Sequence, residues 1–425
     1  MQEEDLLNNQ NPVEVPPQVG PYKILETIGS GANATVYKAL HVKCMVTVAL
    51  KCIPKKNLTS KIEFEILQRE VGLMKAMDHP FIASLFEVLD DSKNFYIAIE
   101  HVENGNLLDF INLHKGLQES QARRIFYQII TCLEYLHVEK HVVHRDLKAE
   151  NVLLDKYLNI RLVDFGLSKT FKKTDPFLMT TCGSPAYVSP EIIKELPYTA
   201  AADIWSAGVL LYAMVVGTLP FYGDNISALL NQILTASPPL PNNLSPELKL
   251  LLSRLLVKDP RGRIKLQEIK EHPWLADFEE TQMLAEDKSL IKSLKVMDVQ
   301  NLEPGVLSEM KAIGYDVRNL LQEIKSISIN SRTAAYKILR RQRTIEEINL
   351  WQTSRPSKIL KIRDSDQQPL PARSDTTPKS TTRSETPNKY RHTRIRKTAT
   401  DNRRPASPLS NIGHLPPLPS MTPTC

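Results

Sequence analysis

The chain has few cysteines, and none of them stands in a pattern typical of a disulfide framework or a metal site. Five occur among the 425 residues, scattered and without a Cys-x-x-Cys pair. An odd and dispersed set predicts neither structural disulfides nor a zinc site. We therefore expect a protein of a reducing compartment.

We also expect no secretion signal at the start of the chain. Its opening residues, MQEEDLLNNQ, are acidic and polar, whereas a signal peptide is basic and then apolar. One uncharged apolar run, residues 204–222, is nearly long enough to cross a bilayer. Gly208, Gly217 and Pro220 interrupt the run, and no basic residues anchor it, so a buried core helix is favoured over a transmembrane segment. The predicted location is the cytoplasm, with access to the nucleus as an alternative.

Acidic residues are scarce at the C-terminal end. Residues 352–425 hold 14 Lys and Arg against 5 Asp and Glu, a balance of +9, while the whole chain carries +6. Pro, Ser and Thr are frequent there and apolar periodicity is missing, so this tail is predicted to be disordered. Its basic run, residues 391–397, could bind an anionic partner, such as a lipid, a nucleic acid or an acidic protein. A solvated linker without a specific partner is the alternative.

Residues 141–166 bring two acids and an amide to one spot. Asp146, Lys148 and Asn151 share a short loop, and Asp164 follows on a second loop after an apolar, hairpin-like segment at 152–163. Phosphoryl transfer needs magnesium held by oxygen ligands, a carboxylate that orients the attacking hydroxyl, and a cation near the moving phosphate. This stretch could supply all three.

Short β-branched segments at residues 22–30, 34–42 and 46–54 predict an antiparallel sheet at the start of the ordered chain. Gly29 and Gly31 lie between the first two segments, where the lack of a Cβ would let the backbone approach a phosphate. An ordinary hairpin turn is the better explanation of that motif taken alone. The third segment carries Lys51 near its end, and the two features together favour nucleotide binding.

The segments that follow are mainly helical. Residues 60–77 and 121–138 both repeat apolar side chains at helical spacing, and Glu70 lies within the first of them. Strands followed by helices predict an α+β protein of two lobes, with a ligand site in the cleft between them.

The motif His144-Arg145-Asp146-Leu147, with Asn151 after it and Asp164-Phe165-Gly166 further on, resembles the catalytic and magnesium-binding loops of eukaryotic protein kinases. Val48-Ala49-Leu50-Lys51 matches the strand motif of the same family. The alternative, that these are only turn residues flanking strands, is disfavoured because the order and the spacing both agree.

The resemblance implies the two-lobed kinase fold, with a small antiparallel β lobe and a large, mainly helical lobe. It implies ATP and Mg²⁺ as cofactors, an ion pair between Lys51 and Glu70, and a catalytic Asp146 assisted by Lys148. Asn151 and Asp164 would hold the metal. The residues expected around ATP are Ile28, Gly29, Gly31, Val36, Ala49, Lys51, Glu70 and, in the hinge, Glu100 and Val102.

Two positions depart from the family pattern. Ala34 replaces the third glycine of the glycine-rich loop, which predicts altered nucleotide affinity without its loss. Asn106 stands where many relatives carry a Glu that binds a substrate arginine, so a preference for basic substrates is in doubt. Glu150 matches another acid used for that purpose, and Ser184 matches a hydroxyl on the substrate side.

Residues 164–191 resemble an activation loop. Thr180, two residues before Cys182, matches the activating phosphothreonine of the AMP-activated protein kinase and microtubule-affinity-regulating kinase branch, within the calcium/calmodulin-dependent-kinase-like group. An upstream kinase would phosphorylate Thr180, with Thr181 as the less favoured alternative. Arg145 and Lys169 would bind the phosphate and order the loop.

The sequence thus predicts five regions. A disordered N-terminus (1–21) precedes the kinase domain (22–275), a polar connector (276–296), a helical module (297–340) and the mostly disordered basic tail (341–425). Three helical patterns around an Ile-Gly-Tyr turn make the module similar to the ubiquitin-associated-like domain of the same kinase branch, with a generic helical bundle as the alternative. We expect it to act as an intramolecular regulatory module.

The leading prediction is an active serine/threonine protein kinase that acts on protein substrates. A pseudokinase scaffold is the rival from another class, and the presence of Lys51, Glu70, Asp146, Asn151 and Asp164 argues against it. A small-molecule kinase could share the two aspartates. The Thr180 loop and the Ser-Pro-Glu motif that ends it argue against that alternative.

Overall fold

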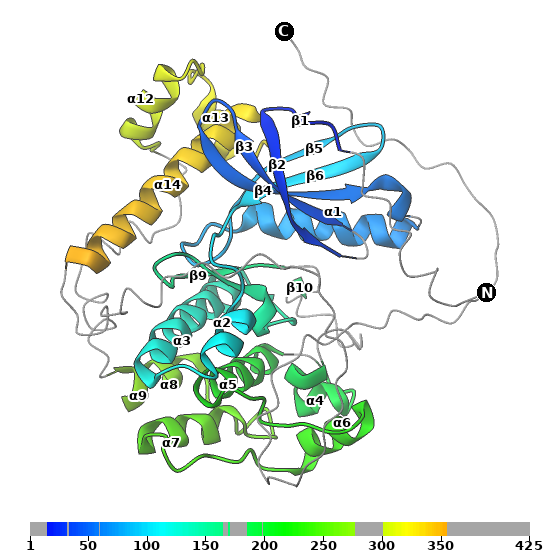
Figure 1. Ribbon diagram of the computed structural model, residues 1–425, viewed down its shortest axis with the longest axis vertical. Helices are drawn as coiled ribbons and strands as arrows, with labels where there is room; N and C mark the ends of the chain where they lie inside the picture. Colours follow the sequence, from blue (N-terminus) through cyan, green and yellow to red (C-terminus); the bar gives the residue numbers. More distant parts are fainter. Residues whose placement is uncertain are drawn as a thin grey trace, which may run out of the picture.

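The computed structural model describes residues 15–31, 34–58, 60–164, 185–197, 199–276 and 301–350, and the backbone of 169–170 and 351–354. A lobe built on a sheet stands above a mainly helical lobe, and further helices flank the upper lobe (Figure 1). This is the two-lobed α+β architecture that the order of strands and helices predicts.

The small lobe is built on an antiparallel sheet of six strands in the order β1-β2-β3-β4-β6-β5. The central strand β4 is buried more continuously than β2, because β3 and β6 cover its two edges. The three predicted opening strands are confirmed as β2, β3 and β4. The strand bounds are β1 Gln18–Val19, β2 Tyr22–Ser30, β3 Thr35–His41, β4 Val46–Pro54, β5 Leu85–Asp90 and β6 Asn94–Glu100.

Helix α1 (Lys61–Ala76) begins at a capping box. The Ser60 hydroxyl accepts a hydrogen bond from the Glu63 amide at 3.2 Å, and the Glu63 carboxylate accepts one from the Ser60 amide at 3.1 Å. This reciprocal pair satisfies two of the amides that a helix start leaves open. Leu67, Val71 and Met74 pack on the main core, which fixes the rotation of the helix about its axis.

The large lobe surrounds α5 (Ala200–Val216), which is buried from Ala202 to Met214. The uncharged run at 204–222 lies largely on this helix, so its prediction as a buried core helix is confirmed. Gly208 lets α7 approach, since a Cβ there would come within 2.9 Å of the Leu255 Cβ. The other helices are α2 Leu107–His114, α3 Glu119–Glu134, α4 Pro190–Ile193, α6 Ile226–Thr235, α7 Pro246–Leu255, α8 Leu266–Lys270 and α9 Pro273–Ala276. Among the helices that the structure describes, none combines the length and the hydrophobicity needed to traverse a bilayer.

A buried ion pair fastens α4 to the end of the large lobe. The Arg263 guanidinium donates two hydrogen bonds to the Glu191 carboxylate, at 2.8 and 2.9 Å, and both side chains are fully enclosed. Arg263 also donates to the carbonyls of Ala201 and Val257.

Beyond the large lobe, the described part of the chain forms three helices: α12 (Pro304–Ala312), α13 (Leu320–Lys325) and α14 (Ser331–Ser354). They lie where the sequence predicts helices and share a small core of their own. Their likeness to a ubiquitin-associated domain stays a prediction. The predicted end of the module at residue 340 is wrong, because α14 continues to Ser354 and buries Arg341, Thr344, Ile348 and Asn349.

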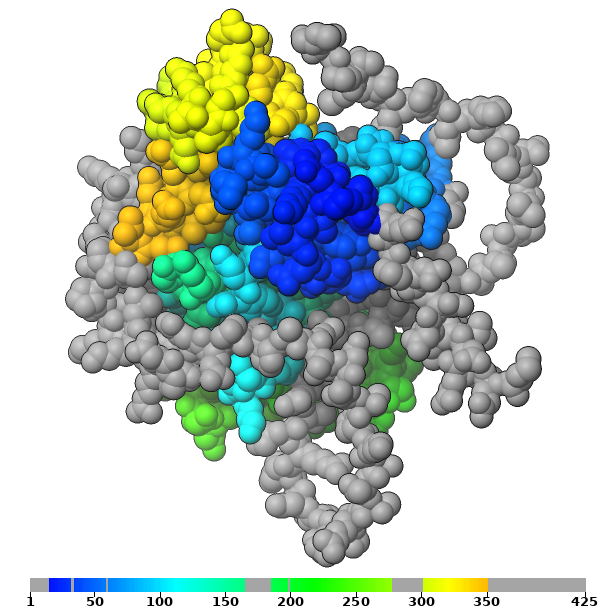
Figure 2. All heavy atoms as spheres, turned by 45° about the horizontal axis from the view of Figure 1, so that its top comes forward, coloured from blue at the N-terminus to red at the C-terminus, as the bar shows by residue number. Residues whose placement is uncertain are grey.

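The module, defined here as α12–α14, packs on the small lobe. Figure 2 shows its yellow and orange atoms against the blue atoms of the sheet, and α14 lies along β5. Ala334 and Ile338 of α14 are fully buried in the same cluster as Tyr22, Leu50 and Tyr96 of the sheet. The small lobe and the module therefore share part of a hydrophobic core.

Candidate active site

In the predicted catalytic loop, side chains of neighbouring residues hold Asp146 in place. The Lys148 ammonium lies 2.7 Å from the Asp146 carboxylate, and the Asn151 amide donates to the same carboxylate at 3.0 Å and to the Asp146 carbonyl at 2.8 Å. Because Asn151 stands in the short helical turn Ala149–Asn151, its side chain folds back over the loop. Asp146 is thus 8% exposed and held in one orientation.

Asp203, at the head of α5, supports this loop from below. Its carboxylate accepts hydrogen bonds from the amides of His144 and Arg145, at 2.8 and 2.9 Å, and lies 2.8 Å from the His137 ring. Burial opposes its charge, but the hydrogen bond from His137 and the neighbouring histidines lower the pKa of Asp203. These bonds hold Arg145 at a φ of 72°, a left-handed backbone conformation that costs a residue with a side chain about 1–2 kcal/mol.

The hairpin of β8 (Val152–Leu154) and β9 (Ile160–Leu162) returns the chain to the catalytic loop. The Val163 amide donates to the Asn151 carbonyl at 2.9 Å, which places Asp164 beside Asn151. Asp164 itself has a φ of 68°, and backbone strain of this kind is common at functional sites. An amide oxygen and a carboxylate fit Mg²⁺, which protein sites hold through one or two carboxylates together with the phosphates of a substrate.

The upper side of the site carries the predicted ion pair between Lys51 and Glu70. Lys51 comes from β4 and Glu70 from α1, and their charged groups lie 3.0 Å apart. Burial opposes the charge of Lys51, but Glu70 and Asp164 outweigh it and raise the pKa of Lys51. The charge of Asp164 acts on Lys51, so the loop that follows β9 lies near β4.

Packing among the described residues does not require the glycines of the first hairpin. Gly29 pairs with Val36 across the β2–β3 ladder, and a Cβ on Gly29 would meet only Val36, at 3.8 Å. A Cβ on Gly31 would meet only the Ala34 carbonyl, also at 3.8 Å. Both contacts are ordinary, so the open backbone here fits the close approach of a ligand.

Two further residues expected around ATP differ in burial. Ala49 is 7% exposed on β4, whereas Ile28 is 45% exposed at the end of β2. An apolar side chain left open at the edge of the sheet is free to cover a bound ring.

The hinge residue Glu100 also forms buried ion pairs that the sequence does not predict. Its amide donates to the Ser84 carbonyl at 2.9 Å, and its carboxylate lies 2.6 Å from Arg161 and 2.8 Å from Arg341. Burial opposes its charge, but Arg341 and Arg161 outweigh it and lower the pKa of Glu100. The side chain is therefore turned away from the hinge, so the predicted contact with adenine concerns the backbone of Glu100 and Val102.

The remaining predicted residues lie on the substrate side or outside the described residues. Glu150 is half-buried near Tyr187, where burial first and the Glu150 charge second raise the pKa of the Tyr187 phenol. Asn106 caps α2, because its side-chain oxygen accepts a hydrogen bond from the Asp109 amide at 2.9 Å. The positions outside are the side chain of Lys169, Thr180 and Ser184.

Sequence reasoning missed three residues that shape the site: Asp203 as the support of the catalytic loop, and Arg161 and Arg341 as the partners of Glu100. A lone acid at the head of a long uncharged run was the signal for Asp203. Arg161 alternates with apolar residues in a predicted strand, where a buried charge requires a partner. Nothing in the sequence indicates that Arg341, and not a neighbouring arginine, would pair with Glu100.

The comparisons with known proteins agree with this geometry. The pattern of the protein kinase domain matches residues 22–275. SNF1-related protein kinase catalytic subunit alpha KIN12 of Arabidopsis thaliana is 38% identical over 319 residues, which are 75% of this chain and 63% of that relative. Serine/threonine-protein kinase SIK1 of Rattus norvegicus is 35% identical over 356 residues, 83% of this chain and 45% of the relative.

A third relative, probable serine/threonine-protein kinase MARK-A of Dictyostelium discoideum, is 40% identical over 293 residues, 68% of this chain and 27% of its own length. The chain thus spans less than two thirds of the length of these three relatives. The kinase pattern covers more than half of the chain. The chain belongs to the protein kinase domain family, in the branch of the SNF1-related, SIK and MARK kinases.

Proposed function

We propose that this protein is an ATP-dependent serine/threonine protein kinase that phosphorylates protein substrates. One observation carries the proposal: the chain combines the Lys51–Glu70 ion pair, at 3.0 Å, with a loop in which Lys148 and Asn151 hold Asp146. A scaffold that binds partners without chemistry has no need for this full set of charged groups.

Nucleotide binding would use the small lobe and the hinge. Lys51, kept charged and oriented by Glu70, would bind the α- and β-phosphates, while the backbone at Gly29 and Gly31 covers them. Asn151 and Asp164 would hold Mg²⁺, which neutralises charge on the phosphates when it is bound. The backbone of Val102 would contact adenine.

Phosphoryl transfer would use the catalytic loop. Asp146 orients the substrate hydroxyl and accepts its proton as the hydroxyl oxygen forms a bond to the γ-phosphorus. The bond between that phosphorus and the β–γ bridging oxygen breaks, and ADP leaves. Lys148, 2.7 Å from Asp146, offsets negative charge on the group in transfer. A lysine in this position resembles serine/threonine kinases more than tyrosine kinases.

The test is transfer of radiolabelled phosphate from ATP to a generic peptide, after treatment with an upstream kinase. Asp146→Asn should nearly abolish turnover and leave nucleotide binding close to that of the natural chain, because Asp146 acts on the hydroxyl. Nucleotide binding without turnover in the natural chain would instead support the pseudokinase scaffold. Equal turnover of both proteins would contradict the role given to Asp146.

We further propose that phosphorylation of Thr180 activates the enzyme. The proposal rests on the sequence around Thr180, which lies outside the described residues, and on the position of Arg145 beside the catalytic Asp146. A phosphate there adds about −1.5 to −2 charge, which Arg145 and Lys169 could bind. Thr180→Ala should remain at basal activity after treatment with the upstream kinase, and Thr181→Ala should respond normally. Full activation of Thr180→Ala would contradict the proposal.

The module is proposed to tune this activity from the rear of the hinge. Support comes from Arg341 of α14, which contacts both Glu100 and the backbone of the segment before β5. Asn349, further along α14, lies 3.3 Å from Asn159 of the large lobe. Chains that end at residue 276 and at residue 354 should differ in kcat/KM toward the same peptide. Identical values would argue against regulation by the module.

A further inference from the structure

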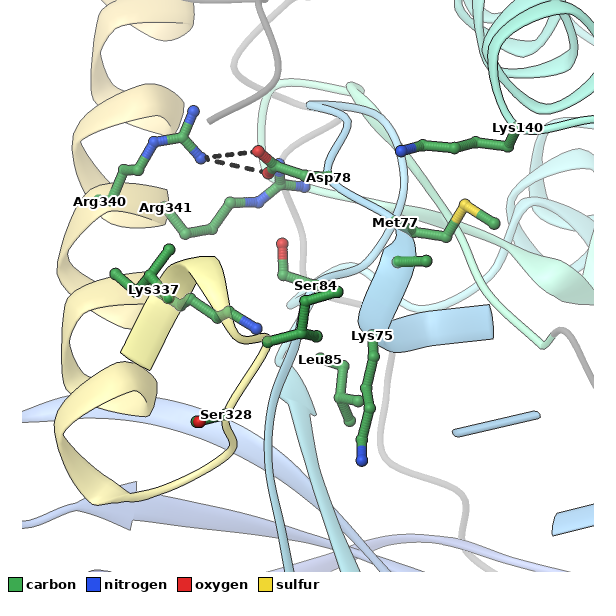
Figure 3. Close-up of a pocket in the computed structure, with 13 residues that line it drawn as sticks. Lys75, Met77, Asp78, Ser84, Leu85, Lys140, Ser328, Lys337, Arg340 and Arg341 are labelled. Carbon is green, nitrogen blue, oxygen red and sulfur yellow. Dashed lines mark hydrogen bonds and ion pairs between the residues drawn. The ribbon is translucent and has the colours of Figure 1, made fainter. Parts of the chain in front are cut away.

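A cavity of about 170 Å³ lies where the module meets the kinase lobes. Its walls come from the end of α1 and the start of β5 in the small lobe, from α13 and α14 of the module, and from Lys140 in the large lobe (Figure 3). None of its lining residues belongs to the catalytic loop or the glycine-rich hairpin. It is therefore separate from the nucleotide site.

The polar side of the cavity is strongly basic. Five cations line it against a single acid, Asp78. Two of the cations are already neutralised, because Arg340 pairs with Asp78 and Glu303, and Arg341 pairs with Glu100. The three others are lysines: Lys75, Lys140 and Lys337.

Of these lysines, Lys337 gives the strongest indication of an anion site. Figure 3 shows its ammonium extending from α14 toward Ser84 and Leu85, while that of Lys140 points toward Asp78 from the large lobe. Within the described part of the chain, Lys337 has no hydrogen bond or ion pair that would hold its ammonium. Burial lowers the pKa of Lys337, Asp78 partly offsets this effect, and Lys75 adds to it. A half-buried cation repelled by a second cation would be stabilised by an anion.

The other side of the cavity is apolar, with Met77, Leu85, Ile324 and Ile327 in its lining. Ile327 has a φ of 55°, a left-handed conformation that a β-branched residue rarely adopts. Such strain is typical of segments whose geometry serves a ligand. The cavity thus combines unneutralised lysines, an apolar wall and a strained residue at its edge.

We propose that this cavity binds a small amphipathic anion, namely a carboxylate or phosphate group on an apolar body about the size of a benzene ring. The size follows from the volume, since an apolar cavity of about 150 Å³ can hold benzene. The anionic group would lie between Lys337 and Lys140, with the ring against Leu85 and Met77. A ligand held by residues of the lobes and of the module favours the state in which they are packed together.

Phenyl phosphate is a suitable probe, tested by calorimetry on the full chain in low salt. Benzyl alcohol serves as the neutral comparison of similar size, and inorganic phosphate as the anion without a ring. We expect phenyl phosphate to bind more tightly than either, because only it satisfies both sides of the cavity. Equal affinity of benzyl alcohol, or no binding of phenyl phosphate at millimolar concentration, would overturn the proposal.

Matched variants locate the binding. Lys337→Met should weaken phenyl phosphate binding by about tenfold or more, the loss expected for one hydrogen bond to a charged group. Lys325→Met, an exposed lysine of α13 outside the cavity, should leave the affinity unchanged. Lys51→Met should also leave it unchanged, which separates this cavity from the nucleotide site.

Lys140→Met gives a second test that does not alter the module, and it should weaken binding in the same direction as Lys337→Met. Circular dichroism of each variant checks that it is folded before its affinity is compared. If both variants bind phenyl phosphate as tightly as the natural chain, the lysines do not form the site and the proposal is wrong.

Discussion

Arg341→Met is the substitution that tests most directly how the module is held on the kinase lobes. Arg341 is 5% exposed and donates to the Glu100 carboxylate at 2.8 Å. It also donates to the carbonyls of His79, Pro80 and Ile82, at 3.0, 2.7 and 2.9 Å. Methionine keeps much of the apolar stem and removes every donor.

The size of the effect follows from what the variant leaves behind. If α14 stayed in place, Glu100 would keep Arg161 as a partner. The His79 carbonyl would keep the Ile82 amide as a donor, at 3.1 Å, but the buried carbonyls of Pro80 and Ile82 would lose the hydrogen bonds that Arg341 donates. Breaking a buried ion pair from one side costs about 3–5 kcal/mol. If α14 leaves the lobes, water reaches these groups, so the kinase lobes themselves lose less stability. We therefore expect a loss of about 3–5 kcal/mol in the docking of the module, and a smaller loss in the stability of the lobes.

Hydrogen exchange of the full chain measures this docking. A loss of 3 kcal/mol corresponds to a more than hundredfold fall in protection wherever opening requires release of the module. The fall should appear in α14 and in the segment from Asp78 to Leu85, and β2 should change less. Arg343→Met is the matched control, because the pair of Arg343 with Glu309 is 42% exposed on both sides and contributes at most about 1 kcal/mol. Equal protection in the two variants would refute the role of Arg341 as the anchor.

Three further predictions concern stability, each measured by urea unfolding. Arg263→Met should lower the free energy of unfolding by about 3–5 kcal/mol, because Glu191 is left buried without its partner; a loss below 1 kcal/mol would contradict this. Asn106→Ala should cost about 1 kcal/mol by removing the cap of α2, and Asn106→Ser should restore most of it. Burial, Arg341 and Arg161 lower the pKa of His79 to about 3, so between pH 6.5 and 3 the unfolded chain binds a proton that the folded chain does not. Stability should then fall by about 2 kcal/mol between pH 7 and 5, and His79→Asn should lose this part of the pH dependence.

The arrangement of the proposed catalytic groups could be predicted from the sequence because their spacing is short and their chemistry is specific. Asp146, Lys148 and Asn151 lie within six residues of one another, and the structure joins them by hydrogen bonds of 2.7–3.0 Å. The Lys51–Glu70 pair joins a strand and a helix. The end of a predicted strand places Lys51, helical periodicity places Glu70, and the structure pairs the two side chains as predicted. In both cases, local pattern determines which way the side chain points.

Partners brought together by packing alone could not be predicted in the same way. Arg340, Arg341 and Arg343 are close in sequence, but their surroundings differ. Arg340 pairs with Asp78 and Glu303, Arg341 is buried against Glu100, and Arg343 stays half-buried beside Glu309. Only the rotation of α14 on the small lobe distinguishes them. A basic sequence of this kind is typical of a solvated helix face or of the start of a disordered tail, which explains why the predicted boundary came too early.

The charge cluster behind the hinge bears on how the module could leave. Arg161 lies 3.5 Å from Asp155 and 2.6 Å from Glu100, so the kinase lobes alone contribute one positive and two negative charges. Arg341 completes a neutral cluster of two arginines and two acids. When α14 leaves, the excess negative charge on the lobes becomes accessible to water, and so does Arg341, so neither surface keeps a buried unpaired ion. A contact made of polar groups on both sides thus suits reversible docking better than an apolar contact. In the kinase lobes, the partner of Arg341 is Glu100, whose backbone is expected to contact adenine.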